Sequence, residues 1–130
     1  MAKYLSVEWI DDLHASASAN RDLQELSRRH RLRVTETVTG APDGDVSYHL
    51  ILGEGTIRIA AGPGEDSDVC FAQDYATAVG LATGALNAQT AFVSGQLRVT
   101  GDMDLLMASQ PVFAALDAVF SDVRGRTEFV

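Results

Sequence analysis

Cysteine is almost absent from this sequence of 130 residues, because Cys70 is the only one. A single cysteine excludes an intramolecular disulfide and suggests no cysteine-based metal site. Long apolar runs are also missing, since none approaches the ~20 residues that a membrane-spanning helix needs. Glu8, Asp11 and Asp12 follow soon after Met1 and leave no room for the apolar core of a secretory signal. We therefore expect a cytoplasmic protein.

Positive charge is scarce as well. Ten Lys and Arg stand against 18 Asp and Glu, which gives a formal net charge of −8. This charge repels phosphate backbones, so we expect no nucleic-acid partner. The densest basic patch covers residues 28–31 and reads Arg-Arg-His-Arg. It could touch an acidic partner or an anionic membrane, but the sequence favours a solvated helix end, where cations complement the helix dipole.

The sequence also lacks the motifs of catalysis and metal binding. Ser94 is not preceded by the first glycine of a nucleophile elbow. His14, His30 and His49 are scattered and show no metal-ligand spacing. The acidic segment 62–68 lacks the ligand pattern of a calcium loop, and we interpret it as a solvated hairpin loop. We therefore predict no catalytic residues, no metal and no cofactor.

The patterns that are present indicate helices first and strands next. Ser6 is suited to cap a helix, and a second helical stretch covers 22–29. The pattern then changes to period two, which predicts strands over 32–39, 46–52, 56–60 and 68–73. Short turns separate the first three of these strands and favour an antiparallel meander.

The second half returns to helical spacing. Asp74 is a candidate N-cap for a helix over 74–86, which contains Gly80 and Gly84. These glycines indicate either tight packing on the sheet or a wall left clear for a ligand. A short helical stretch over 88–93, a strand over 96–100 and helices after Asp102 and Pro111 complete the chain. We predict one α+β domain over 1–130, with a mainly antiparallel five-stranded sheet covered by helices in the order α-ββββ-α-β-α.

A series of linked blocks lies between Asp68 and Met107. A strand ends at Asp74, which opens a helix, and Thr83-Gly84 follows. The segment 87–92 reads Asn-Ala-Gln-Thr-Ala-Phe, and the segment 95–103 reads Gly-Gln-Leu-Arg-Val-Thr-Gly-Asp-Met. These blocks resemble the sterol carrier protein 2 domain family, closely over about 40 residues, and the resemblance extends to the order of elements elsewhere. Gln96 stands where the family usually has Lys.

This resemblance implies an apolar tunnel between sheet and helices that binds and transfers a lipid-like molecule (a fatty acid, an acyl-CoA or a sterol) without a cofactor. Gln110 would offer a polar contact to a head group. The expected ligand-binding residues are Phe71, Val79, Leu81, Ala82, Leu86, Phe92, Leu97, Val99, Leu105, Leu106, Gln110, Phe113 and Leu116.

Two other functions remain open at this stage. Similar domains serve as accessory or dimerising parts of larger enzymes, so the chain could be an interaction module, a homodimer or a transient partner of a membrane or an enzyme. A small isomerase or cyclase with a cone-shaped α+β fold is less favoured. Those folds place long helices before the sheet and an Asp or His inside the cone, and this sequence shows neither clearly.

Overall fold

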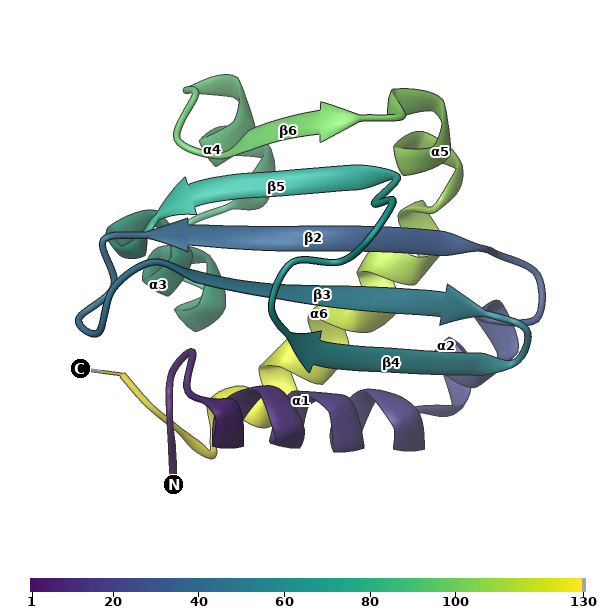
Figure 1. Cartoon of the computed structure of the whole chain (residues 1–130), viewed down its shortest axis with the longest axis horizontal. Coiled ribbons are helices and arrows are strands. Elements are labelled where there is room, and N and C mark those ends of the chain that lie inside the picture. The colour runs from purple at the N-terminus through teal and green to yellow at the C-terminus, as the bar shows by residue number, and fades with distance from the viewer. Residues whose placement is uncertain (130) are drawn as a thin grey trace.

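The computed structural model describes residues 1–129 and shows one central sheet with helices gathered on one side of it (Figure 1). The sheet contains β2 (Leu32–Thr39), β3 (Val46–Gly53), β4 (Thr56–Ala61), β5 (Val69–Asp74) and β6 (Arg98–Gly101). All five lie within two residues of the ranges that the period-two pattern predicts. The α+β class and the five-stranded sheet are confirmed.

The strands lie in the order β4-β3-β2-β5-β6. The pairs β2–β3, β3–β4 and β5–β6 are antiparallel, so the first three strands form the predicted meander. In contrast, β5 pairs with β2, and this pairing is parallel. The prediction of a hairpin loop over 62–68 is therefore wrong, because β5 does not return beside β4.

Segment 62–68 instead crosses the outer face of the sheet from β4 to β5 (Figure 1). Hydrogen bonds fix this crossing connection to the strands beneath it. The Gly64 amide donates to Thr35 Oγ1 at 3.0 Å, and Thr35 Oγ1 also bonds Ser67 Oγ. The Asp68 amide donates to the Arg33 carbonyl, and the Arg33 amide donates to the Asp68 carboxylate. Two parallel strands that are neighbours need such a crossover, because a tight turn joins only antiparallel strands.

The helices begin where side chains cap their first turns. The Ser6 hydroxyl accepts from the Trp9 amide at the start of α1 (Val7–Ala19), and Asn20 caps α2 (Arg21–Leu26) in the same way. Asp74 caps α3 (Tyr75–Thr83) as predicted. Asn87 caps α4 (Ala88–Val93), and Asp102 caps α5 (Met103–Ala108). The last helix, α6 (Gln110–Arg124), has its proline in the first turn, which agrees with the predicted new helical segment.

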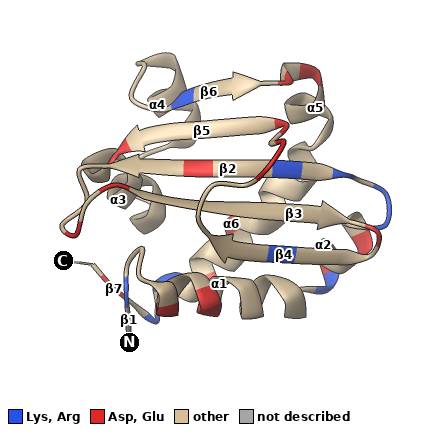
Figure 2. Cartoon of the chain, viewed as in Figure 1, with Lys and Arg blue, Asp and Glu red and all other residues tan. Residues whose placement is uncertain are grey.

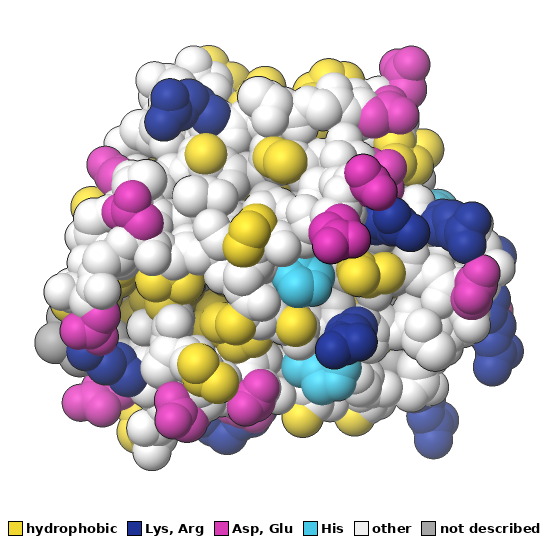
Figure 3. Space-filling model, viewed as in Figure 1, with side chains coloured by type: hydrophobic (Ala, Val, Ile, Leu, Met, Phe, Trp, Pro, Cys, Tyr) yellow, Lys and Arg dark blue, Asp and Glu magenta, His cyan; other side chains and the backbone are white. Residues whose placement is uncertain are grey.

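The core lies between the inner face of the sheet and the helices, with α6 crossing behind the strands (Figure 1). Trp9 and Leu13 of α1 are almost completely buried there, as are Val119 and Val123 of α6. No helix within residues 1–129 covers the outer face, on which charged and histidine side chains mix with scattered hydrophobic ones (Figure 3).

The basic patch lies at the end of α2 and in the connection to β2, on the surface (Figure 2). Arg28 pairs there with Glu25, and Arg31 pairs with Glu54 at 2.9 Å. This position agrees with the solvated helix end that the sequence favours.

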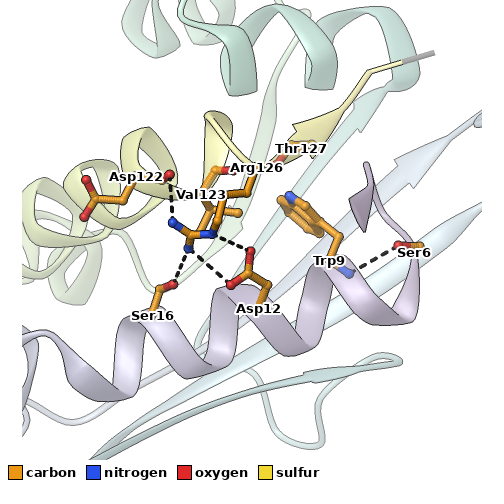
Figure 4. A network of polar contacts seen from close by, with 8 residues as sticks. All are labelled: Ser6, Trp9, Asp12, Ser16, Asp122, Val123, Arg126 and Thr127. Carbon is orange, nitrogen blue, oxygen red and sulfur yellow. Dashed lines mark hydrogen bonds and ion pairs between the residues drawn. The ribbon is translucent and has the colours of Figure 1, made fainter. Parts of the chain in front are cut away.

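The first and last described segments lie side by side. The short strands β1 (Ala2–Lys3) and β7 (Thr127–Glu128) pair in parallel, which the sequence patterns did not indicate. Next to them, Arg126 donates two hydrogen bonds to the Asp12 carboxylate, at 3.1 and 3.2 Å, and one to Ser16 Oγ at 2.9 Å (Figure 4). Asp12 raises the pKa of Arg126, first through the hydrogen bond and then through its charge. The network joins the end of α6 to α1.

Gly101 supports a prediction about stability. It ends β6 with φ at +113°, and a Cβ atom there would collide with the backbone carbonyl of Asp68. We expect Gly101→Ala to lower the free energy of unfolding by about 2 kcal/mol or more, because strain and collision combine. The matched control is Gly95→Ala, where φ is +82° but no atom lies within 4 Å of the new Cβ. It should cost only about 1 kcal/mol. If both variants lose the same free energy of unfolding in urea, the collision with Asp68 is not the reason for a glycine at position 101.

Candidate functional site

A cavity of about 870 Å³ lies between the inner face of the sheet and the helices. This volume is within the range of several hundred to about 1,000 Å³ that is common for small-molecule sites. Strands β2, β3, β4 and β5 supply one wall, and helices α1, α3 and α6 supply the other. The cavity that the resemblance led us to expect is therefore present.

The cavity has a buried interior and an exposed rim. Interior residues such as Leu13, Leu50 and Ala78 have less than a tenth of their surface exposed. The rim lies on the connection from α3 to α4, on the first turn of α4 and on the exposed side of α6. Its exposed residues are Gly84, Ala85, Asn87, Ala88, Gln89, Asp117 and Ser121. Arg124 joins the two sides of the rim, because its Nε donates to the Ala82 carbonyl at 2.7 Å.

Seven of the thirteen predicted ligand-binding residues line this cavity. They are Phe71, Leu81, Ala82, Leu86, Leu97, Phe113 and Leu116. The rings of Phe71 and Phe113 are in edge-to-face contact, with their centroids 5.7 Å apart. The sheet and α6 thus meet at this aromatic pair, which borders the apolar space.

The other six predicted residues lie outside the cavity lining. Phe92 is half exposed on α4, and Gln110 is exposed at the start of α6, where its amide donates to the Leu106 carbonyl. The remaining four are partly buried and pack against the core: Val79, Val99, Leu105 and Leu106. All thirteen residues were expected from the family resemblance, which does not tell which apolar residue faces the cavity and which packs against a neighbouring element.

The structure explains the two glycines of the predicted 74–86 helix by packing. A Cβ atom at Gly80 would lie 3.1 Å from Cβ of Leu86, so the chain itself fills this space. Gly84 has φ at +81° and ends the helix at Thr83, before the predicted end at residue 86. The left-handed residue turns the chain back, and Leu86 then donates its amide to the Gly80 carbonyl at 2.9 Å. Leu86 consequently reaches the cavity from a loop rather than from the helix.

Polar side chains form a cluster on the inner wall of the cavity. Glu36 of β2, Tyr48 of β3 and Gln73 of β5 all line it. The Tyr48 hydroxyl donates to Glu36 Oε2 at 3.2 Å, and the Gln73 side-chain amide donates to the same oxygen at 3.3 Å. Close by, the hydroxyl of the cavity-lining Tyr4 donates to the Ala78 carbonyl.

Burial sets the electrostatics of this cluster. Loss of water raises the pKa of Glu36, and the hydrogen bonds from Gln73 and Tyr48 offset only part of that effect. Burial, and then the charge of Glu36, raises the pKa of Tyr48 well above its ordinary value. The pKa of Tyr4 is raised for the same two reasons, with a further contribution from Tyr75. None of the ion pairs within residues 1–129 includes Glu36.

The sequence analysis did not identify this cluster, although a signal for part of it exists. Val34 and Val38 are buried on the inner face of β2, and Glu36 lies between them on the same face of the strand. Alternation therefore places the carboxylate inside. The partners could not be found in this way, because Gln73 becomes a neighbour only through the unforeseen parallel pairing of β2 with β5.

Metal ligands and membrane spans are absent from the described part of the chain. Within residues 1–129, no three His, Cys, Asp or Glu side chains come together as metal ligands would. Over the same residues, no helix combines the length and apolar character that crossing a bilayer requires.

Comparisons with known proteins agree with the fold. The model of the SCP-2 sterol transfer family matches residues 10–114. No curated protein matches the sequence. Among solved structures, the chain is similar to a conserved hypothetical protein of Thermus thermophilus, described as possibly a sterol carrier protein. Their sequences are 20% identical over 95% of this chain and 91% of the other, with a TM-score of 0.71.

Two further structures show the same likeness. A crystal structure of sterol carrier protein 2 is 19% identical over 94% of this chain and 98% of its own, with a TM-score of 0.70. Sterol carrier protein domain 2 of Helicoverpa armigera is 26% identical over 95% of this chain and 91% of its own, with a TM-score of 0.61.

The raised pKa of Glu36 leads to a prediction about pH. Its native pKa lies above the ordinary value of 4.5, so the native state holds the proton more tightly than the unfolded state. The stability from this group is present below pH 4.5 and is lost as pH rises through the raised pKa, by at most about 1.4 kcal/mol per pH unit. Glu36→Gln should remove this loss. In urea unfolding from about pH 4 to pH 8, the variant should gain stability relative to the wild type as pH rises.

Glu65→Gln is the control for this experiment, because Glu65 is exposed in the crossing connection. Its stability should follow that of the wild type across the pH range. Parallel curves for wild type and Glu36→Gln would show that Glu36 titrates as it does in the unfolded chain.

Proposed function

Because the chain belongs to the SCP-2 sterol transfer family, we propose that residues 1–130 form a single non-catalytic domain that carries a lipid in the cavity between sheet and helices. The cargo is expected from the fatty acids, acyl-CoAs and sterols. The observation that carries the proposal is the cavity itself, which has about 870 Å³ of space and opens at an exposed rim. A cytoplasmic location stays a prediction.

The lining gives such a cargo its affinity. The aliphatic and aromatic walls include Leu81, Leu116, Phe71 and Phe113. Each Å² of apolar ligand surface that these walls remove from water contributes roughly 25 cal/mol before the costs of association are subtracted. A hydrocarbon chain or ring system can therefore bind here without charge pairing.

The exposed side of α4 and α5 favours a second function, as a protein-interaction or dimerisation module beside a lipid or steroid enzyme. Phe92 is half exposed and Val93 largely exposed on α4, and Met107 is largely exposed on α5; these two helices stand at the two ends of the edge strand β6 (Figure 1). Apolar side chains left exposed beside a sheet edge are candidates for a contact surface. Sedimentation velocity separates the two functions. A strict monomer that binds lipid supports the carrier, and a stable dimer without lipid uptake supports the module.

A substitution that fills the cavity tests the proposal directly. Ala82 lines the cavity on α3, whereas Ala76 is exposed on the same helix. We expect Ala82→Phe to weaken the binding of a fluorescent fatty acid by about tenfold or more, because the ring occupies space that the ligand needs. Ala76→Phe adds the same ring outside the cavity and should bind as the wild type does. Circular dichroism and thermal unfolding confirm that both variants fold.

Native mass spectrometry of the freshly purified protein would identify the natural cargo. A lipid bound at close to one molecule per chain is expected, and it should be lost from Ala82→Phe. If Ala82→Phe is folded and still takes up the fluorescent fatty acid with unchanged affinity, the ligand binds elsewhere and the proposal is wrong.

A further inference from the structure

The inner wall of the cavity carries a polar cluster at the centre of the sheet. Glu36 and Tyr48 are direct partners across the antiparallel pair β2–β3. On the other side of β2, Glu36 faces Phe71, so Gln73 lies two residues further along β5. Three neighbouring strands therefore bring a carboxyl, a phenol and an amide together in a wall that is otherwise mainly aliphatic and aromatic.

The cluster does not satisfy every hydrogen-bonding atom of the Gln73 side chain. Its side chain is buried, with 5% of the residue exposed, and its amide nitrogen donates to Glu36. Its carbonyl oxygen, Oε1, has no hydrogen-bond partner within residues 1–129. A buried acceptor without a partner costs free energy, and proteins rarely leave one in that state. Gln73 lines the cavity, and although its present side-chain position shields Oε1, a small rotation would let a ligand donor satisfy this oxygen.

The charged side chains around the cavity determine whether the head group that donates to Gln73 can itself be charged. Among the described residues that line the cavity, Arg124 and His49 are the basic ones. Arg124 is at the rim and bonds the Ala82 carbonyl, and His49 bonds the Gly62 carbonyl of the crossing connection. The hydrogen bonds of both side chains thus lead away from Glu36. A ligand carboxylate at the inner wall would face Glu36 without a compensating cation, which is costly in a buried place.

On the premise of the proposed function, we infer that the cavity selects a lipid with an uncharged hydroxyl head and holds it with the head inward. The hydroxyl donates to Gln73 Oε1 and lies against the Glu36 carboxyl. The hydrocarbon part runs past the contacting rings of Phe71 and Phe113 toward the rim. The Glu36–Tyr48–Gln73 cluster is thus a subsite for the head group, and it discriminates against carboxylate heads.

A series of ligands with one chain length tests this subsite. The ligands are decan-1-ol, its methyl ether, decanoate and decylamine, each titrated calorimetrically into the full chain at about pH 7.5. The ether keeps the oxygen but has no donor, and decanoate carries the negative charge. We expect the alcohol to bind about tenfold more tightly than either, which is the size of effect that one buried hydrogen bond produces.

Two substitutions locate the head group. Gln73→Leu removes the unpaired acceptor and should reduce the preference for alcohol over ether to about twofold or less. Glu36→Gln keeps the shape but removes the charge, so it should strengthen decanoate binding relative to the alcohol. It also serves as the second variant if Gln73→Leu does not fold. Gln24→Leu is the matched control, since Gln24 is exposed on α2 and lies outside the cavity lining, and its ligand preferences should equal those of the wild type.

The outcomes separate this inference from the proposed function. If none of the four ligands binds, the inference is wrong, and the proposed function is then decided by the fluorescent fatty acid and Ala82→Phe. If the ligands bind with equal affinity, or if both cluster variants keep the wild-type preferences, the cavity carries lipid but the cluster does not recognise its head. Tightest binding by decylamine would show that Glu36 acts as a counter-ion for a cationic head, which also overturns the inference.

Discussion

The parallel pairing of β2 with β5 is the constraint on which the rest of the structure depends. It forces segment 62–68 across the outer face of the sheet, and it places β5 between β2 and β6. The helices that follow β5 then return on the inner side, where α3 and α6 contact each other. The cavity lies between these helices and the central strands, so its position follows from this one pairing.

Much of this arrangement could be predicted from local pattern. Alternation located the strands, and short polar side chains such as Ser6 and Asp74 marked the helix starts, because strand faces and helix caps are determined by residues close in sequence. The hairpin prediction over 62–68 was wrong because strand pairing is a long-range property. A loop rich in glycine and acidic residues is compatible with a hairpin and with a crossing connection.

The site also divides into residues that local patterns can indicate and residues that only long-range contacts bring together. Phe71 and Leu116 could be placed at the cavity from family blocks and helical spacing, whereas Gln110 and Phe92 lie outside its lining. A polar residue near an apolar face could be a head-group contact or a surface residue, and spacing alone does not decide. Glu36 was absent from the predicted site. Its position between buried valines was readable in the sequence, but its partners belong to strands that meet it only in the folded chain.

The rim of the cavity has a consequence for kinetics. Its two sides are joined by the hydrogen bond from Arg124 to the Ala82 carbonyl, at the point where α3 ends. Residues 84–85 and 87–89 beyond it are exposed and lie outside the sheet. If the cavity carries a ligand as proposed, separation of this short connection from α6 would widen the way out while the strands stay paired. Exchange would then depend on a local opening, and changes elsewhere in the core could alter the stability of the fold without altering the rate of exchange.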